Sequence, residues 1–269
     1  MVVIKSPLRY PGGKSKAISQ IMPQIPPDFK EYREPFVGGG SVFFAIKQLW
    51  GEQVETYWLN DLNYDLYCFW LTAQNDIKKL VDRISEIKQT QLDGRVLFAE
   101  LTQDNLTLNE FERAVRFFLL NRITFSGTVE SGGYSQQAFE KRFTPSSIQR
   151  LYAIGQILCD VKITNLDYDA VIQPPGEKVF IFLDPPYWSA TKSKLYGKKG
   201  NLHTNFDHDR FAQTMKQCPH RWLITYDDSP KIRDLFHFAQ IVEWDLQYGM
   251  NNYRQGKAAK GKELMIKNY

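Results

Sequence analysis

The residues with the clearest chemical potential are Asp184-Pro185-Pro186-Tyr187, which directly follow the apolar run Val179–Leu183. Such a run is typical of a buried strand in a parallel sheet. The two prolines lack a backbone N–H and have a fixed φ, so the strand ends there in a rigid turn. Ligands of open α/β sheets bind at this end of the strands. The turn therefore predicts a site that presents a carboxylate, two backbone carbonyls and an aromatic ring.

A planar ring with an exocyclic amino group matches this turn. Asp184 and the Pro185 carbonyl can both accept hydrogen bonds from the amino group, while Tyr187 stacks on the ring. The lone pair of an aromatic amine is delocalised, so its nitrogen is a poor nucleophile. Two acceptors favour a pyramidal nitrogen and direct its lone pair at an electrophile. An ordinary proline-rich turn is the alternative, but the acid directly after the apolar run favours the site.

A glycine-rich turn, Gly38-Gly39-Gly40, lies between a predicted strand that begins near Glu31 and a predicted buried helix that begins near Val42. Glycines allow the backbone to approach a ligand closely, and helix N–H groups point at its polar end. Phe43 replaces the third glycine of the dinucleotide pattern, which favours a smaller adenosine ligand. A plain tight turn is the alternative.

Other predicted strands also end in acidic residues, at positions 54–61, 161–167 and 221–228. A carboxylate at the position of Asp61 typically accepts hydrogen bonds from ribose hydroxyls in a doubly wound sheet. A helix N-cap is the other interpretation of Asp61. Residues 263–266 form a last predicted strand, and Asp207 is expected to cap a helix. The polar segment from Trp188 to Asn205 has no helix or strand pattern, so we expect a mobile loop beside the site.

The Gly-Gly-Lys-Ser sequence at positions 12–15 is similar to a phosphate-binding loop, but the required earlier glycine is replaced by Leu8. No suitable strand precedes it, so we exclude a nucleoside triphosphatase. The turn instead presents the Tyr10 ring and the Lys14 ammonium on one short loop. A solvated N-terminal turn is the alternative.

The middle of the chain has a different character. Residues 75–120 show the apolar periodicity of amphipathic helices, and a polar, glycine-rich loop follows at 121–135. Lys141, Arg142 and Arg150 come next. Asn and Arg side chains make bidentate contacts to adenine and guanine edges, so this region is a candidate nucleic-acid surface. A helical insertion with a surface loop is the alternative.

Length, net charge and the spacing of cysteines and histidines restrict the kinds of protein that this chain can be. The 269 residues fit one large domain or a domain with an insertion, and the net charge of +4 is compatible with a polyanionic partner. The cysteines have no Cys-x-x-Cys spacing, and the histidines have no metal-ligand spacing, which predicts reduced thiols and no metal. The sequence has neither a membrane-spanning apolar run nor a signal-peptide pattern. We therefore expect a cytoplasmic protein, without membrane contact and monomeric by default.

Taken together, these motifs resemble the Dam-like adenine-N6 DNA methyltransferases over essentially the whole chain. The matching motifs are Pro-Gly-Gly-Lys at 11–14, Glu-Pro-Phe-x-Gly-x-Gly at 34–40, Asn60-Asp61, Leu119-Leu120-Asn121-Arg122, Asp184–Tyr187 and Glu263-Leu264. The resemblance implies an α/β fold with a Rossmann-like S-adenosylmethionine-dependent methyltransferase sheet and helices on both faces. It also implies a catalytic domain at 1–68 and 155–269, with an inserted, mainly helical target-recognition domain at 69–154.

The resemblance assigns roles to individual residues. S-adenosylmethionine is the implied cofactor, and Asp184 would lie between it and the target amine. The implied catalytic residues are Asp184, Pro185, Pro186 and Tyr187. The implied cofactor contacts are Tyr10, Lys14, Phe36, Gly38 and Gly40 at the methionine end, Asp61 at the ribose, Asp167 and Tyr168 at the adenine, and Asp184. The expected DNA contacts are Asn121, Arg122, Ser126, Tyr134, Lys141 and Arg142. Tyr10 departs from the tryptophan that is common in the group, but it keeps an aromatic ring.

The implied reaction methylates N6 of an adenine that is flipped out of double-stranded DNA, because N6 is inaccessible inside the stack. GATC is the commonest target of the family, and a cognate restriction endonuclease is a candidate partner. A protein-glutamine methyltransferase usually has Asn in place of Asp184, and a cytosine-N4 methyltransferase usually has Ser there. The lack of a cysteine in a Pro-Cys setting argues against cytosine-C5 chemistry. A non-catalytic nucleic-acid-binding module is the alternative of a different class, and it would not bind S-adenosylmethionine.

Overall fold

The computed structural model describes residues 5–129, 131–189, 205–246 and 261–269. Its centre is a seven-stranded sheet with the order β3-β2-β1-β4-β5-β7-β6. The neighbours β3 to β5 pair in parallel, whereas β7 runs antiparallel to both β5 and β6. The strands are β1 Glu31–Glu34, β2 Thr56–Asn60, β3 Val161–Thr164, β4 Val179–Leu183, β5 Arg221–Asp227, β6 Gln240–Leu246 and β7 Gly261–Lys267. The sequence patterns predicted all of these strands except β6.

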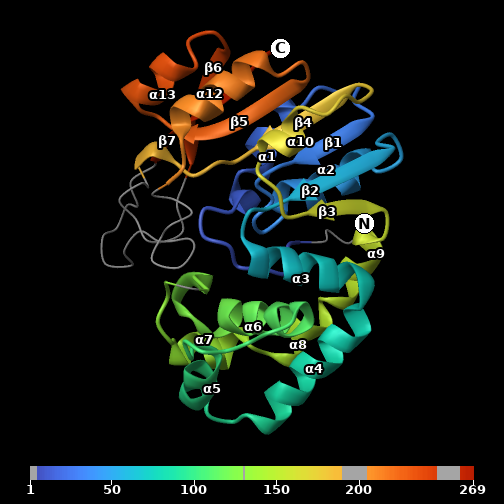
Figure 1. Ribbon diagram of the computed structural model, residues 1–269, viewed down its shortest axis with the longest axis vertical. Helices are drawn as coiled ribbons and strands as arrows, with labels where there is room; N and C mark the ends of the chain where they lie inside the picture. Colours follow the sequence, from blue (N-terminus) through green and yellow to red (C-terminus); the bar gives the residue numbers. More distant parts are fainter. Residues whose placement is uncertain (1–4, 130, 190–204, 247–260) are drawn as a thin grey trace.

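The central strand β4 explains how helices cover both faces of the sheet. All of its residues are buried, and they alternate between two apolar clusters. Phe180 and Phe182 pack on the face that is covered by α1 and α2, while Ile181 and Leu183 pack on the face that is covered by α10, α12 and α13. Side chains alternate along a strand, so one continuous apolar run supplies both cores. The expected Rossmann-like layers are confirmed (Figure 1).

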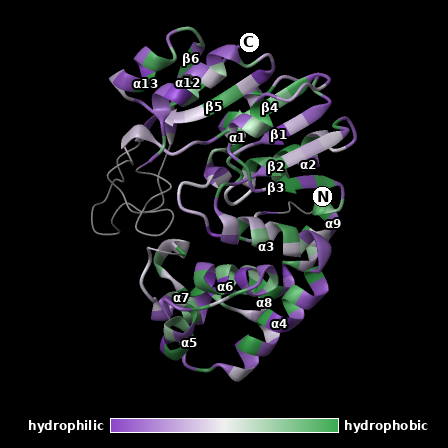
Figure 2. Cartoon of the chain, viewed as in Figure 1, coloured by the Kyte–Doolittle hydropathy of each residue, from purple (hydrophilic) through white to green (hydrophobic). Residues whose placement is uncertain are grey.

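Helices α3 to α8 form a second part below the sheet, and α9 leads back to β3 (Figure 1). The helices flanking the sheet are α1 Ile18–Ile21, α2 Ser41–Trp50, α10 Asp169–Ile172, α12 His208–Gln217 and α13 Pro230–Leu235. The others are α3 Tyr64–Asn75, α4 Ile77–Thr90, α5 Gly94–Leu101, α6 Glu110–Ile123, α7 Gln136–Arg142, α8 Pro145–Gln149 and α9 Tyr152–Leu158. The amphipathic helices predicted over 75–120 are confirmed, and hydrophilic and hydrophobic residues alternate along α4 (Figure 2).

The helical part and the sheet share one apolar core. The same cluster contains Phe180 of β4, Phe69 of α3 and Phe118 of α6, and the rings of Phe69 and Phe118 stack at 6.0 Å. The expected domain boundaries at 68/69 and 154/155 fall inside α3 and α9. The division into a catalytic domain and an inserted domain stays a prediction.

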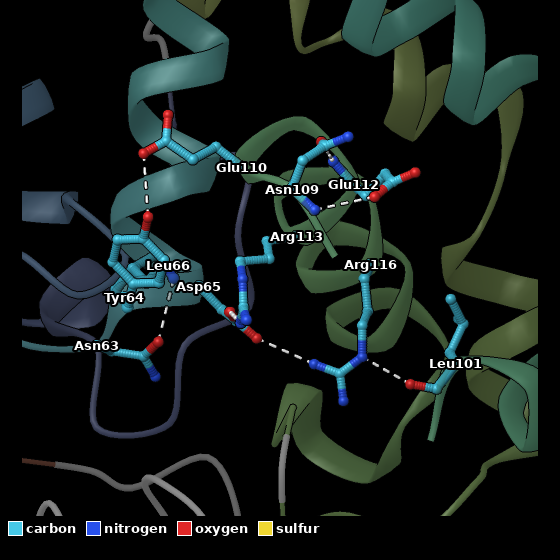
Figure 3. Close-up of polar contacts among 10 residues, drawn as sticks. All are labelled: Asn63, Tyr64, Asp65, Leu66, Leu101, Asn109, Glu110, Glu112, Arg113 and Arg116. Atoms are coloured by element: carbon cyan, nitrogen blue, oxygen red, sulfur yellow. Dashed lines mark hydrogen bonds and ion pairs between the residues drawn. The ribbon is translucent and has the colours of Figure 1, made fainter. Parts of the chain in front are cut away.

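A buried carboxylate holds α3 and α6 together. Asp65 of α3 accepts from Arg113 at 2.7 Å and from Arg116 at 3.0 Å, both on α6, and its side chain is only 8% exposed (Figure 3). Arg116 also donates to the Leu101 carbonyl at the end of α5. The start of α6 is fixed by a capping box in which Asn109 bonds the Glu112 N–H. These contacts fix α6 against the helix that follows β2.

Candidate active site

A cavity of about 630 Å³ opens at the carboxyl ends of β1, β2 and β4. This is the edge at which open α/β sheets bind ligands. All of the predicted catalytic and cofactor residues line this cavity: Tyr10, Lys14, Phe36, Gly38, Gly40, Asp61, Asp167, Tyr168, Asp184, Pro185, Pro186 and Tyr187. The fold therefore brings these residues to one place, while their individual roles stay predictions. The predicted mobile loop lies mostly outside the described residues, because 190–204 are not described.

The glycine turn forms the floor of the cavity. Gly38 and Gly40 have φ values of 46° and 69°, in the left-handed region that favours glycine. A Cβ atom at Gly38 would lie 2.9 Å from Cε1 of Tyr10, so the tyrosine ring packs directly on the turn. The Gly38 carbonyl accepts from the indole N–H of Trp70 at 3.1 Å. The turn is thus fixed by α3 while α2 begins directly after it.

Asp61 ties the glycine turn to the start of α3. Its Oδ2 accepts from the Gly38 N–H at 2.9 Å, and its Oδ1 accepts from the Asn63 N–H at 3.0 Å. The N-cap of α3 is Asn63, whose side chain accepts from Leu66, so the alternative of Asp61 as N-cap is wrong. Burial raises the pKa of Asp61 to about 6, although both N–H donors favour its charged form.

An acceptor-rich wall adjoins Asp61. Glu34, at the end of β1, is buried and accepts from the Tyr32 hydroxyl at 2.6 Å. Burial, together with the charges of Asp184 and Asp61, raises the pKa of Glu34 to about 8. Glu34 lines the cavity, but the sequence reasoning did not count it as a site residue. Its place in the Glu-Pro-Phe-x-Gly-x-Gly motif was the available signal.

Asp184 lies between two donors. Its Oδ1 accepts from the Thr225 hydroxyl at 2.7 Å, and its Oδ2 forms an ion pair with Nζ of Lys14 at 2.7 Å. The Lys14 ammonium also donates to the Gly12 carbonyl at 3.0 Å and lies 4.9 Å from the centre of the Tyr187 ring. The charge of Lys14 thus lies beside the predicted catalytic carboxylate of Asp184. It also lies over the ring of Tyr187, which was predicted to stack on the target base.

The turn after β4 is anchored by β5 and β7. The Tyr187 hydroxyl donates to Glu263 at 2.9 Å, and the Trp188 and Ser189 N–H groups donate to the two oxygens of Asp227 at 2.9 and 3.0 Å. Asp227 and Glu263 are paired in the β5–β7 register. The sequence patterns found both acids but gave neither a role, because the register that brings them to the turn is a tertiary feature.

An aromatic wall closes the side at which the cofactor adenine was predicted. The ring of Tyr168 lies 5.6 Å from that of Phe36 and 5.8 Å from that of Phe206. Asp167 binds Arg210 through both carboxylate oxygens, at 2.8 and 3.2 Å. Asp207 caps α12, as predicted, by accepting from the Arg210 N–H. This side of the cavity offers flat apolar surfaces and a fixed carboxylate.

The predicted DNA contacts do not line the cavity, and their roles stay predictions. Asn121 is fully buried, and its amide accepts from the Arg9 N–H at 3.0 Å and donates to the Arg9 and Gly127 carbonyls. It therefore holds the N-terminal loop to α6, and both of its amide N–H groups are used in doing so. Ser126 has a φ of 57° in a short turn, and the hydroxyl of Tyr134 donates to Gln136. Lys141 and Arg142 are exposed, whereas Arg122 is buried.

The described residues contain no helix long and apolar enough to cross a membrane, and they contain no cluster of potential metal ligands. The fold and the cavity define a class of enzyme, the methyltransferases with a Rossmann-like sheet. Residues 10–250 match the D12 class N6 adenine-specific DNA methyltransferases, and the chain belongs to this family.

Individual relatives agree with this family. Type II methyltransferase M.MjaIII of Methanocaldococcus jannaschii is 28% identical, with 99% of each chain covered. The DNA adenine methylase of Vibrio cholerae is 24% identical over 87% of this chain and 85% of its own length. The DNA N-6-adenine-methyltransferase of Escherichia phage P1 is 30% identical over 87% of this chain but only 31% of its own length. The predicted activity, an adenine-specific DNA methyltransferase with S-adenosylmethionine as methyl donor, is confirmed.

Proposed function

We propose that this enzyme methylates N6 of an adenine that it flips out of double-stranded DNA into the cavity described above. The observation that carries the proposal is the position of Asp184, which lies in one cavity with both the glycine turn and the Tyr187 ring. The glycine turn lines this cavity together with Asp61 and the rings of Phe36 and Tyr168, and these groups suit the polar and flat parts of S-adenosylmethionine. When bound, this cofactor supplies an electrophilic methyl group.

The residues of the chain have separate tasks in this proposal. Asp61 and the glycine turn hold the cofactor, and Tyr168 with Phe36 flanks its adenine ring. Tyr187 stacks on the flipped adenine, while Asp184 and the Pro185 carbonyl each accept a hydrogen bond from the N6 amino group. This arrangement directs the N6 lone pair towards the glycine turn. Positive charge that develops on N6 is stabilised by these fixed acceptors, which need no reorganisation.

The ion pair between Lys14 and Asp184 has to open before Asp184 can bind the adenine amine. The Lys14 ammonium is bonded to the Asp184 carboxylate, which would accept from the adenine amine. It also lies over the Tyr187 ring, on which the adenine would stack. We therefore propose that Lys14 shifts away from Oδ2 of Asp184 when the base enters. Until then, it compensates the charge of a carboxylate that is largely removed from water.

Methyl transfer from labelled S-adenosylmethionine to unmethylated genomic DNA tests the reaction. Separated product bases should carry the label in N6-methyladenine, whereas label in N4-methylcytosine would overturn the base assignment. Asp184→Ala should retain DNA binding and lose methyl transfer, because the acceptor for N6 is gone. Full activity of this variant would contradict the proposed mechanism.

We propose GATC as the target sequence, supported by the resemblance to the Dam-like group, in which it is the commonest target. Sequencing the methylated sites tests this directly. The type II names among the relatives support a cognate restriction endonuclease as partner. Lysates of the source cells should then cleave unmethylated DNA but spare DNA that this enzyme has methylated. A monomeric state and a cytoplasmic location also stay predictions.

A further inference from the structure

A network of charged side chains lies at the edge of the cavity, beside the ring of Tyr168, and Arg210 of α12 is at its centre. The guanidinium group donates to both oxygens of Asp167, at 2.8 and 3.2 Å, and it also donates to Asp169 at the start of α10. Asp167 lies in the segment that joins β3 to α10. Arg210 therefore ties the start of α12 to the segment that carries Asp167 and Tyr168.

The Arg210 side chain is held in one position from several directions. Its backbone N–H donates to Asp207, the N-cap of α12, at 2.9 Å. Its guanidinium carbon lies 5.0 Å from the centre of the Tyr168 ring. The second oxygen of Asp169 accepts from the Thr214 hydroxyl, one turn further along α12, at 2.8 Å. The paired donors of the guanidinium group are thus fixed by the fold.

A contribution to stability does not explain why this network lies in the cavity. The side chains of Arg210 and Asp167 are 47% and 46% exposed, and exposed ion pairs contribute little to the free energy of unfolding. Among the described residues of the cavity lining there are two cations, and each is bonded to a carboxylate of the same lining: Lys14 to Asp184, and Arg210 to Asp167. The first pair lies at the acceptor for the target amine, and the second lies at the side proposed for the cofactor adenine.

Asp167 has an acceptor oxygen with room for a further donor. Its Oδ1 accepts from Arg210 and from the Asp169 N–H, the latter at 3.1 Å, whereas Oδ2 accepts from Arg210 alone among the described residues. A carboxylate oxygen can accept two hydrogen bonds. Adenine carries its amino group at the edge of the ring. An adenine that packs beside Tyr168 can present this amino group to the neighbouring Asp167 carboxylate.

We propose that Arg210 is a positioning residue for cofactor recognition: it holds the Asp167 carboxylate so that Oδ2 accepts from the N6 amino group of the S-adenosylmethionine adenine. A guanidinium group has only donors, so Arg210 cannot accept from the amino group itself. Its two parallel N–H donors fix the plane of a carboxylate, which a single point charge would not do. The inference rests on the proposed function, which places the adenine ring beside Tyr168 and Phe36.

Calorimetry with two cofactor analogues tests the proposal on the full-length enzyme. S-adenosylhomocysteine carries the amino group, whereas S-inosylhomocysteine carries a carbonyl oxygen in its place, which cannot donate to Asp167. The unsubstituted enzyme should bind the adenosyl compound roughly tenfold more tightly, the effect of losing one hydrogen bond to a charged group. Asp167→Asn should remove most of this preference, because an amide can donate as well as accept. Arg210→Gln should reduce it to about threefold or less, because the carboxylate remains but is no longer held.

A double variant shows whether Arg210 acts through Asp167. Arg210→Gln combined with Asp167→Asn should bind S-adenosylhomocysteine as tightly as Asp167→Asn alone, because the group that Arg210 positions is already changed. Additive losses of affinity would overturn the positioning role. So would a full preference for the adenosyl compound in Arg210→Gln.

Arg233→Gln is the matched control. Arg233 binds Asp228 through both carboxylate oxygens and also pairs with Glu243, so its network is of the same kind as that of Arg210. None of these three residues belongs to the described lining of the cavity. The control should keep the full preference for the adenosyl compound, with a melting temperature similar to that of Arg210→Gln. An equal loss of preference in both variants would overturn the proposal, because it would show a general effect of removing an exposed arginine.

Failure of this inference is distinguishable from failure of the proposed function. Methyl transfer from S-adenosylmethionine to DNA, with N6-methyladenine as the product, is measured separately for the unsubstituted enzyme. Normal transfer together with equal affinities for the two analogues would overturn only the contact between Asp167 and the cofactor adenine. Absence of N6-methyladenine would overturn the proposed function, whereas the preference between the analogues is measured without DNA.

Discussion

At the scale of single residues, the two carboxylates of the cavity have different environments. Asp184 has a cation and a hydroxyl as partners. The Asp61 carboxylate instead accepts from two backbone N–H groups, and burial raises its pKa. A carboxylate with a raised pKa binds a proton in the folded state at a pH where it would be ionised in water. The proposed contact to ribose hydroxyls needs the ionised form as a double acceptor.

Cofactor affinity should therefore depend on the protonation of Asp61. Its pKa of about 6 lies above its usual value of 3.8, so the ionised form is lost as the pH falls through about 6. We expect the affinity for S-adenosylhomocysteine, measured by calorimetry, to fall when the pH is lowered from about 7 to about 5. Asp61→Asn should weaken binding about tenfold and remove this dependence. An unchanged pH profile in that variant would show that another group is responsible.

Residue types and spacing alone identified much of the cavity. The Asp184 turn, the glycine turn and Asp61 could be found because each is a local signal at the end of a strand. The structural position of Asn121 was not predictable because it depends on packing against Arg9, which is distant in the chain. Glu34 was missed as a site residue because its burial follows from the covering layers of the fold. Residues with a local sequence signal were thus predictable, while the residues that they contact in the folded chain were not.

At the scale of elements, β5 and β7 act together as a support for the turn after β4. Thr225 and Asp227 of β5 bond Asp184 and the backbone after Tyr187, and Glu263 of β7 bonds the Tyr187 hydroxyl. Strand pairing places Asp227 opposite Glu263. The stacking ring and the catalytic carboxylate are therefore held by neighbouring rigid strands.

Tyr187→Phe tests this support, because it keeps the ring and removes only the hydroxyl. We expect kcat to fall about tenfold with KM for DNA little changed, since a hydrogen bond to a charged group stabilises by about 1.5–3 kcal/mol. Glu263→Ala should have a similar effect, and the double variant should lose little more. Additive losses in steady-state kinetics would show that the two side chains act independently.

The one strand that the sequence patterns missed is β6, and a signal for it existed. Val242 and Trp244 alternate with Glu243 and Asp245, as in a half-exposed strand. The strand lies at the end of the sheet and pairs only with β7 among the described strands. Strands of this kind lack the continuous apolar run that made β4 clear, so they have to be recognised by their alternating pattern.

At the scale of the whole molecule, the helical part is joined to the sheet by a shared apolar core, and the Asp65 ion pairs fix α6 to α3, the helix that follows β2. A shared core makes independent unfolding of the two parts unfavourable. Asp65→Asn leaves Arg113 and Arg116 with a weaker partner at a buried site. We expect this variant to lose on the order of 2–3 kcal/mol of the free energy of unfolding.

Thermal denaturation checks this prediction through the melting temperature and the shape of the transition. Asp82→Asn is the control, since Asp82 pairs with Lys78 on the exposed face of α4, where solvent screens the pair, and should hardly change the melting temperature. Both variants should unfold in a single transition. Two separated transitions would show that the sheet and the helices are thermodynamically independent, in favour of the domain division predicted from the sequence.

The strand order has a consequence for the synthesis of the chain. β7 follows β6 in the sequence, yet it lies between β5 and β6 in the sheet. While the ribosome has made β6 but not β7, β5 has an open edge and β6 lacks its neighbour. Open edges attract strands from other chains, so this is the interval in which the nascent protein is most exposed to mispairing. Glu263, which bonds the Tyr187 hydroxyl, belongs to β7. The support for the stacking ring is therefore completed only when β7 joins the sheet.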